Sequence, residues 1–230
     1  MTTVSLDKPS LDFLLPLGEY TKKFKKGDFL FQEGTEANEL FYIQSGIIQI
    51  SKITPDGKEL CLRICQKDDL IGELSMFSDQ STHMLNAKVL DDCEALVISK
   101  HRLECEIFEN PKLGYEFLKW MSDQFRRTQT KLRDLILNGK KGALYSTLIR
   151  LANSYGRETE QGVLIDIALT NQQLANFCGT ARESVNRMLN ELKKKNIVTF
   201  KQGKITVHDL DYLKKVNHCE GCPIEYCRIE

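Results

Sequence analysis

Short apolar segments separated by turn residues dominate the first half of the chain. Between Phe24 and Ser99 these segments are divided by groups such as Pro55-Asp56-Gly57, in which proline presets φ and glycine tolerates a positive φ. Evenly spaced short strands with glycine-rich turns predict a β-sandwich or barrel. The expected strands are 40–43, 47–50, 60–64, 87–90 and 95–98, with a turn at Ser45-Gly46 between the first two.

One long helix is predicted from about Pro111 to Leu137, because helix-forming residues dominate and neither glycine nor proline follows Gly114. An ordinary amphipathic helix packed on its own domain is one interpretation. We favour a dimerisation helix, because an apolar row with the 3.5-residue repeat of a coiled coil runs along a basic segment. Asn138-Gly139 ends this helix, and Lys140-Lys141-Gly142 is expected to form a hinge. The apolar row consists of Met121, Phe125, Thr128, Leu132 and Leu135.

Two short helices joined by a turn at Gly179 are predicted in the C-terminal third. A capping box, threonine followed three residues later by glutamine, begins the first helix at Thr170. A second capping box is expected to begin the second helix at Thr180, with Glu183 as its acidic member. Two short segments, Ile197–Lys201 and Lys204–His208, follow and predict a β-hairpin wing.

The second of these helices has one apolar face and one polar face. Its apolar residues lie at i, i+3, i+4 and i+7, so they face the domain core. Polar residues that face outward from the second helix of such a pair are the geometry of helix-turn-helix DNA recognition. A three-helix bundle with a solvated face is the alternative, in which Glu183 serves only as a cap. The predicted DNA-reading residues are Arg182, Glu183, Asn186 and Arg187.

Charge is distributed unevenly along a chain whose 230 residues carry no net charge. Residues 52–110 hold twelve acidic and seven basic side chains, whereas residues 119–150 hold eight basic and two acidic ones. Only the second half is therefore suited to a phosphate backbone. No apolar run approaches the ~18 residues of a membrane span, and no signal peptide is recognised. We expect a cytoplasmic protein that binds double-stranded DNA.

Three of the eight cysteines crowd the last residues as Cys219-x2-Cys222-x4-Cys227. A disulfide framework is not expected in a cytosolic chain of this length. Such tight spacing in a reducing compartment predicts a metal site. Four other cysteines lie in or beside the apolar pattern and are expected to be small core residues. These four are Cys61, Cys65, Cys93 and Cys105.

The chain resembles the cyclic-AMP receptor and fumarate–nitrate regulator (CRP/FNR) family of bacterial transcription factors. The resemblance spans nearly the whole chain and rests on residues 27–34, Ser45-Gly46, residues 71–74, the long helix and residues 174–192. It implies an α+β protein that is not an enzyme; no phosphate loop or nucleophile elbow is present in the sequence. The implied parts are a jelly-roll sensor domain over 1–110, a dimerisation helix over 111–138, a winged helix-turn-helix over 139–210 and a cysteine-rich tail over 211–230.

The cysteine-rich tail is similar to that of the anaerobic regulators of Bacillus and its relatives, which carry a C-terminal iron–sulfur cluster. No cysteine precedes Cys61, which excludes the N-terminal cluster of the enteric regulators. The resemblance implies an oxygen-responsive [4Fe-4S] cluster on Cys219, Cys222 and Cys227. Zinc or a thiol-redox switch is the alternative. The fourth ligand is open among Asp134, His218, Cys178 and a small molecule, and the resembled subgroup uses the aspartate.

Further expectations follow from the same resemblance. The protein is expected to act as a homodimer, with RNA polymerase as a partner, and the run Arg182-Glu183-x-x-x-Arg187 resembles the residues with which the cyclic-AMP receptor reads TGTGA. Loss of the cluster is expected to free the tail and weaken DNA binding without separating the dimer. Cyclic AMP binding is not expected, because Leu85 stands where nucleotide-binding members have an arginine that neutralises the phosphate; Lys88 is an outside candidate for that role.

Overall fold

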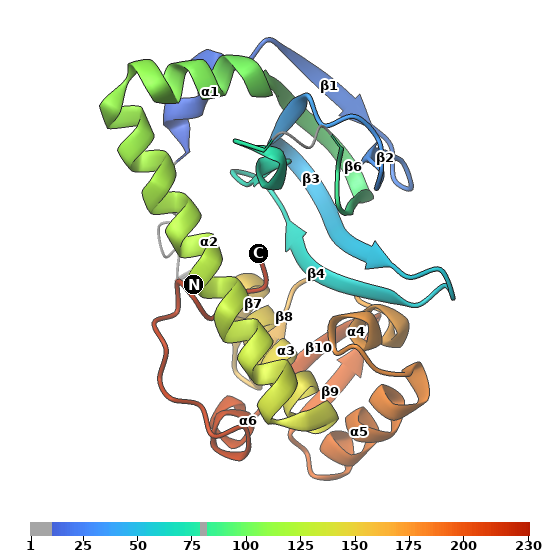
Figure 1. Ribbon diagram of the computed structural model, residues 1–230. Helices are drawn as coiled ribbons and strands as arrows, with labels where there is room; N and C mark the ends of the chain where they lie inside the picture. Colours follow the sequence, from blue (N-terminus) through green and yellow to red (C-terminus); the bar gives the residue numbers. More distant parts are fainter. Residues whose placement is uncertain (1–10, 79–81) are drawn as a thin grey trace. The chain divides into compact units, whose positions relative to one another are not determined.

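The computed structural model describes residues 11–78 and 82–230, and these form two compact units. The division falls within α2 (Pro111–Leu137), between Ser122 and Asp123. The expected fold class is confirmed: an N-terminal β domain, a long helix and a C-terminal domain with a helix-turn-helix (Figure 1). Each unit is described below by itself.

The N-terminal unit is built on an antiparallel sheet in which strands pair in the order β1-β6-β3-β4. Two short strands complete it, with β2 on β6 and β5 on β3. Short 3-10 helices lie at Asp12–Leu17 and Glu73–Ser75, and α1 (Lys100–Glu109) follows the last strand. The strands are β1 (Tyr20–Phe24), β2 (Phe29–Phe31), β3 (Glu39–Ile53), β4 (Glu59–Cys65), β5 (Leu70–Ile71) and β6 (Asn86–Ser99).

The turn expected at Ser45-Gly46 is wrong, because β3 continues through it as one strand. The pairing of β3 with β6 shifts register around Ser45, and Gly46 has a φ of +95°. A Cβ at position 46 would lie 2.5 Å from the carbonyl oxygen of Asp92. The glycine therefore allows an irregularity within a long strand instead of a reversal. The strands expected at 87–90 and 95–98 are likewise one strand, β6.

The central strand β3 contributes apolar side chains to the core from both of its faces. Alternate residues of β3 enter two apolar clusters: Phe41 and Ile43 belong to one, Leu40 and Tyr42 to the other. The second cluster also contains apolar side chains of α1 and of the first three turns of α2. The three cysteines on strands are buried, as predicted: Cys61, Cys65 and Cys93.

The prediction for Cys105 is wrong, since this cysteine is exposed. It lies on α1, whose buried side is marked by Leu103, and two further residues along the helix bring Cys105 to the outer side. Its Sγ lies 3.2 Å from Nδ1 of His101, one turn earlier. The apolar neighbours in the sequence did not distinguish the two sides of this short helix.

The C-terminal unit is organised around α3 (Gly139–Tyr155), in which every residue from Gly142 to Ala152 is buried. A four-stranded antiparallel sheet has the order β7-β8-β10-β9, and it contains the expected hairpin wing as β9 and β10. The first two strands and the last helix were not predicted from the sequence. The strands are β7 (Gly156–Thr159), β8 (Gly162–Ile165), β9 (Val198–Lys201) and β10 (Lys204–Val207), and the last helix is α6 (Leu210–Val216).

The hinge expected at Lys140-Lys141-Gly142 is wrong, because these residues form the first turn of α3. The helical path changes at Asn138 and at Gly139, whose φ is +58°. A Cβ at position 142 would lie 2.0 Å from Cβ of Asn138 and 2.8 Å from Oδ1 of Asn217. Gly142 is thus required by close packing rather than by flexibility. In the described part of the chain, no helix has the length and apolar character needed to cross a membrane.

Candidate nucleic-acid and metal sites

The helix-turn-helix consists of α4 (Asn171–Phe177) and α5 (Arg182–Lys194), which pack against each other (Figure 1). The predicted capping box at the start of α4 is confirmed: the Thr170 hydroxyl accepts from the Gln173 amide, and the Gln173 side chain accepts from the Thr170 amide. Gly179 has a φ of +56° in the turn between the two helices. The glycine therefore supplies a conformation that other residues seldom adopt.

The second predicted capping box is wrong, because α5 begins one residue later than expected. Helix α5 begins at Arg182 with Ala181 as its N-cap, and no side chain caps it. Thr180 instead belongs to the turn that closes α4, since its amide donates to the carbonyl oxygen of Ala175 at 3.1 Å. Its Oγ1 is buried and has no hydrogen-bond partner among the described residues.

The two faces of α5 are arranged as predicted, with Val185, Met188, Leu189 and Leu192 buried. All four predicted reading residues are exposed. Oδ1 of Asn186 accepts from Nδ2 of Asn171 at 3.1 Å, so α4 holds one of them. The side chains of Arg182, Glu183 and Arg187 make no ion pair or hydrogen bond within the described chain, which leaves their donors and acceptors available to a ligand.

The wing is a tight hairpin. Strands β9 and β10 pair from Lys201 opposite Lys204, which leaves a two-residue loop. Both loop residues have a positive φ, 52° at Gln202 and 77° at Gly203. This is the geometry of a type I′ turn, which matches the twist of the flanking strands.

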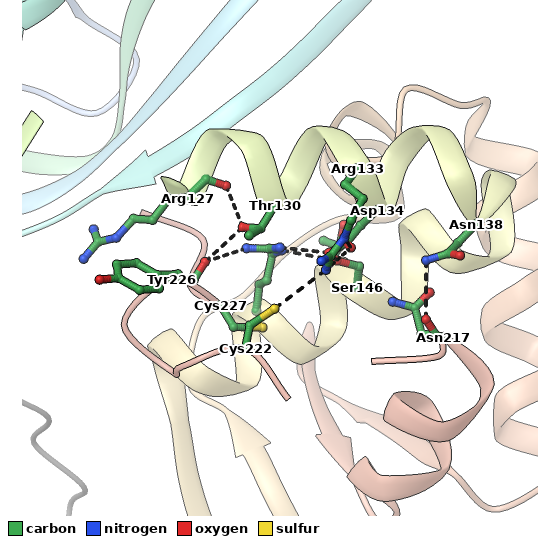
Figure 2. A network of polar contacts seen from close by, with 12 residues as sticks. Arg127, Thr130, Arg133, Asp134, Asn138, Ser146, Asn217, Cys222, Tyr226 and Cys227 are labelled. Atoms are coloured by element: carbon green, nitrogen blue, oxygen red, sulfur yellow. Dashed lines mark hydrogen bonds and ion pairs between the residues drawn. The ribbon is translucent and has the colours of Figure 1, made fainter. Parts of the chain in front are cut away.

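The cysteine-rich tail after α6 is bound to α2 and α3 through its main chain (Figure 2). Nε of Arg127 donates to the carbonyl oxygen of Glu225 at 2.9 Å, and Nη1 of Arg150 donates to that of Tyr226 at 3.0 Å. Nδ2 of Asn153 donates to the carbonyl oxygen of Cys227 at 2.7 Å. Three successive carbonyl groups of the tail are thus satisfied by side chains of two helices, which fixes the path of the tail.

Asp134 lies at the centre of this network. Its Oδ2 accepts from Oγ of Ser146 at 2.6 Å and from Nη2 of Arg150 at 2.8 Å. Its Oδ1 accepts from Nη2 and Nε of Arg133 at 3.0 and 3.2 Å. Burial by itself would raise the pKa of Asp134, but the hydrogen bonds from Ser146 and Arg150 outweigh burial and hold the pKa below its ordinary value.

The three tail cysteines lie in the same unit as Asp134, with Cys219 exposed and Cys222 and Cys227 half-buried. Sγ of Cys222 accepts a hydrogen bond from Nη2 of Arg133 at 3.8 Å. Burial raises the pKa of the thiols of Cys219 and Cys227. Within the residues that the structure describes, no three histidine, cysteine or acidic side chains form a group ready to hold a metal ion.

Two of the other fourth-ligand candidates have different environments. Cys178 is buried at the end of α4, with Thr147 Oγ1 3.7 Å from its Sγ, and burial raises the pKa of this thiol to about 11. Thiolate formation at Cys178 is therefore unfavourable. His218 is exposed and takes a φ of +50° directly before Cys219.

The apolar row predicted on α2 is only partly exposed. Phe125 and Leu132 are 64% and 48% exposed, whereas Met121 packs against the core cluster of the N-terminal unit. The exposed apolar side chains follow a seven-residue spacing through Leu118, Phe125 and Leu132, flanked by Tyr115 and Ile136. The exposed apolar row therefore lies at a different angle around α2 from the predicted row, and the two rows share Phe125 and Leu132.

Sequence reasoning missed the residues that hold the tail and Asp134, namely Arg127, Arg133, Ser146, Arg150 and Asn153. One signal was present: Arg150 is a lone charge within an otherwise apolar stretch of α3. A charged side chain in a buried helix requires a partner, and Asp134 was already a candidate for another reason.

The fold and the helix-turn-helix define a class of protein, a transcription regulator with an N-terminal β-sheet domain. Residues 21–110 match the cyclic nucleotide-binding domain family, and residues 142–216 match the Crp-like helix-turn-helix domain family. The chain belongs to the CRP/FNR family, whose members are transcription regulators and not enzymes.

Similar proteins agree with this assignment. The chain is 56% identical over 210 residues to the anaerobic regulatory protein of Bacillus subtilis (strain 168), covering 91% of this chain and 88% of that protein. It is 31% identical over 196 residues to the lactate racemization regulatory protein of Lactiplantibacillus plantarum, covering 84% and 89%. A solved structure of a variant of CooA from Carboxydothermus hydrogenoformans shares the fold, with a TM-score of 0.76 at 21% identity over 94% of this chain and 98% of that one.

The binding of the tail by α3 leads to a testable expectation. Asn153→Ala removes the donor to the carbonyl oxygen of Cys227, at a cost of about 1 kcal/mol or about fivefold in local opening. Amide hydrogen exchange measured by mass spectrometry should show faster exchange in residues 225–229 and unchanged exchange in α4 and α5. Asn190→Ala, at an exposed position on α5, is the matched control. Equal exchange of the tail in the two variants would contradict this role of Asn153.

Proposed function

We propose that this protein is an oxygen-responsive transcription regulator of anaerobic gene expression that acts in the cytoplasm. The observation that carries the proposal is that Arg133 contacts both Oδ1 of Asp134 and Sγ of Cys222, which brings the cysteine-rich tail to the helix that carries Asp134, in the same unit as the helix-turn-helix. The likeness to the anaerobic regulatory protein of Bacillus subtilis supports it. In this proposal the tail holds a [4Fe-4S] cluster, and the regulator contacts RNA polymerase at its promoters.

The proposed ligands are Cys219, Cys222, Cys227 and Asp134. Their chemistry fits the group, because iron–sulfur clusters are held by thiolates and Pro223 directly follows Cys222, as in ferredoxin-type loops. When bound, the cluster would supply an oxygen-labile link between the tail and α2. The carboxylate is a harder ligand than thiolate, which suits a labile corner.

The contacts of the tail modify the expected response. Arg127, Arg150 and Asn153 hold residues 225–227 without being candidate ligands themselves. We therefore assign the oxygen-dependent release to the segment 219–222, which carries Cys219 and Cys222, and not to the whole tail. That segment precedes the anchored residues and includes Gly221, whose φ is +70°.

A symmetric dimer is the proposed DNA-binding form. The exposed apolar row through Leu118, Phe125 and Leu132 provides a coiled-coil seam. Dimer symmetry then predicts an inverted repeat with half-sites about one helical turn apart. The proposed site is TGTGA-N6-TCACA, because arginine pairs with guanine and a carboxylate accepts from cytosine N4.

A structural zinc ion or a thiol-redox switch in the tail is the alternative function. The donor set of three thiols and one carboxylate also suits zinc, which binds sulfur and oxygen ligands tetrahedrally. Colour and metal content distinguish the two, since zinc has no visible absorption and an iron–sulfur protein is brown.

Arg187→Ala should weaken binding to TGTGA-N6-TCACA by about 1–3 kcal/mol and relax selection at one base position of each half-site. The physical reason is the loss of a bidentate contact from an exposed guanidinium to a base edge. Fluorescence anisotropy with single-base variants of the site measures both effects. Lys193→Ala, at an exposed position in the last turn of α5, is the charge-matched control and should lower affinity without changing base preference. Equal binding to TTGAT and TGTGA half-sites would contradict the assignment.

Cys227→Ala and Asp134→Ala, purified without oxygen, test the cluster. Wild type should contain iron and acid-labile sulfide and should bind the TGTGA site, and both properties should be lost in Cys227→Ala. Because Cys105 is exposed and lies on α1, Cys105→Ser is the matched thiol control and should behave as wild type. Brown colour and site binding retained in Cys227→Ala would reject the oxygen sensor. Retention in Asp134→Ala alone would only reassign the fourth ligand.

The proposal also includes the absence of cyclic AMP binding. Glu73, in the segment that resembles the nucleotide-binding motif, is buried and forms an ion pair with Arg63 at 2.9 Å. This pairing satisfies the carboxylate within the fold, so Glu73 is retained as a structural residue. Isothermal calorimetry with cyclic AMP should give no heat of binding, and binding in the micromolar range would refute the expectation.

A further inference from the structure

The two oxygens of the Asp134 carboxylate are held in different ways. Oδ2 is bonded by Ser146 and Arg150, which are both buried. Within the described residues, Oδ1 is bonded by Arg133 alone, whose side chain is 31% exposed. Oδ2 is thus fixed by two buried groups, whereas the partner of Oδ1 is partly in water.

Arg133 connects the carboxylate to the segment that carries Cys219 and Cys222. Its Nη2 lies 3.0 Å from Oδ1 of Asp134 and 3.8 Å from Sγ of Cys222. Its Nη1 lies 2.6 Å from Oε2 of Glu220, two residues before that cysteine. Figure 2 shows the Arg133 guanidinium directed at Asp134 and Cys222. A cationic group therefore contacts two of the atoms that would have to bind a metal ion.

We infer that the Arg133 guanidinium competes with a metal ion for Oδ1 of Asp134 and Sγ of Cys222. The inference rests on the proposed function in so far as the tail binds a metal. Both hydrogen bonds to Oδ1 come from Arg133, and both to Oδ2 come from the buried pair, so the carboxylate has no unused acceptor position. A metal ion at Oδ1 therefore requires the guanidinium to leave.

Apart from Asp134, little holds the Arg133 guanidinium in place. The other partner of Arg133, Glu220, is 68% exposed, and such exposed ion pairs contribute little to stability. Ser146 and Arg150 stay on Oδ2 and keep the carboxylate in one orientation, as hydrogen-bonded carboxylate ligands of metals commonly are. Arg133 thus occupies Oδ1 of Asp134 in the absence of a metal ion. The contacts of Ser146 and Arg150 keep the carboxylate in the same orientation when Arg133 is displaced.

The test uses the full-length, reduced, metal-free protein and cobalt(II) as the probe, since thiolate-to-cobalt absorption reports binding at the tail without any iron–sulfur chemistry. Arg133→Gln should bind cobalt(II) about tenfold more tightly than wild type, the size expected when a charge-assisted hydrogen bond no longer competes. Arg126→Gln is the matched control, because Arg126 lies on the same helix and donates to the Tyr226 hydroxyl at 2.7 Å. It should bind as wild type does.

Two further variants separate competition from a general loss of structure. Arg133→Lys keeps the charge and should lie between wild type and Arg133→Gln. The double variant Arg133→Gln, Asp134→Asn should lose the gain, because the uncovered carboxylate is gone. Wild type that binds cobalt(II) as tightly as Arg133→Gln, or more tightly, would overturn the inference and leave the metal site standing. Absence of a thiolate band in every variant would overturn both the inference and the proposed metal site.

Discussion

The buried ion pair between Asp134 and Arg150 is the interaction on which the C-terminal unit depends. The two side chains are almost fully removed from solvent, and their closest atoms are 2.8 Å apart. A buried charge is tolerated only when it is paired and hydrogen-bonded, because desolvation is costly. Ser146 and the carbonyl oxygen of Tyr226 take up further hydrogen bonds of this pair. One charge on α2 and one on α3 therefore determine where the tail can lie.

This pair joins three segments that are far apart in the sequence. Arg150 binds Asp134, 16 residues earlier, and the carbonyl oxygen of Tyr226, 76 residues later. Helix α3 also packs against α4 of the helix-turn-helix and against α6, which leads into the tail. A structural change in the tail would therefore occur next to α3, the helix that packs against the helix-turn-helix. The proposed oxygen response needs only the segment with Cys219 and Cys222 to move, while the remainder of the tail keeps its contacts.

Several errors of the sequence analysis share one cause. Ser45-Gly46 has turn composition, yet it lies in a continuous strand because β6 approaches closely there. Lys140-Lys141-Gly142 has hinge composition, yet it starts a helix whose glycine faces Asn138 and Asn217. Thr180 has the composition of a cap, yet its amide closes the preceding helix. In each case a contact that the composition does not specify decided the role of a residue whose local preference was ambiguous.

The sequence by itself determined the features that depend on local periodicity. The outward face of α5, the capping box at Thr170, the hairpin at Gln202-Gly203 and the extent of α2 follow from residue spacing and backbone preference over a few residues. It also grouped the three tail cysteines by their close spacing.

Only the tertiary structure decided what surrounds those cysteines. Arg127, Arg150 and Asn153 recognise main-chain carbonyl groups, which every residue possesses, so the tail sequence carries no sign of them. The engagement of Arg133 with both Asp134 and Cys222 joins residues 89 positions apart, and no local pattern specifies such a contact. The sequence could name the candidate ligands because ligand chemistry belongs to residue type. It could not show which groups hold them, because that depends on how distant segments pack.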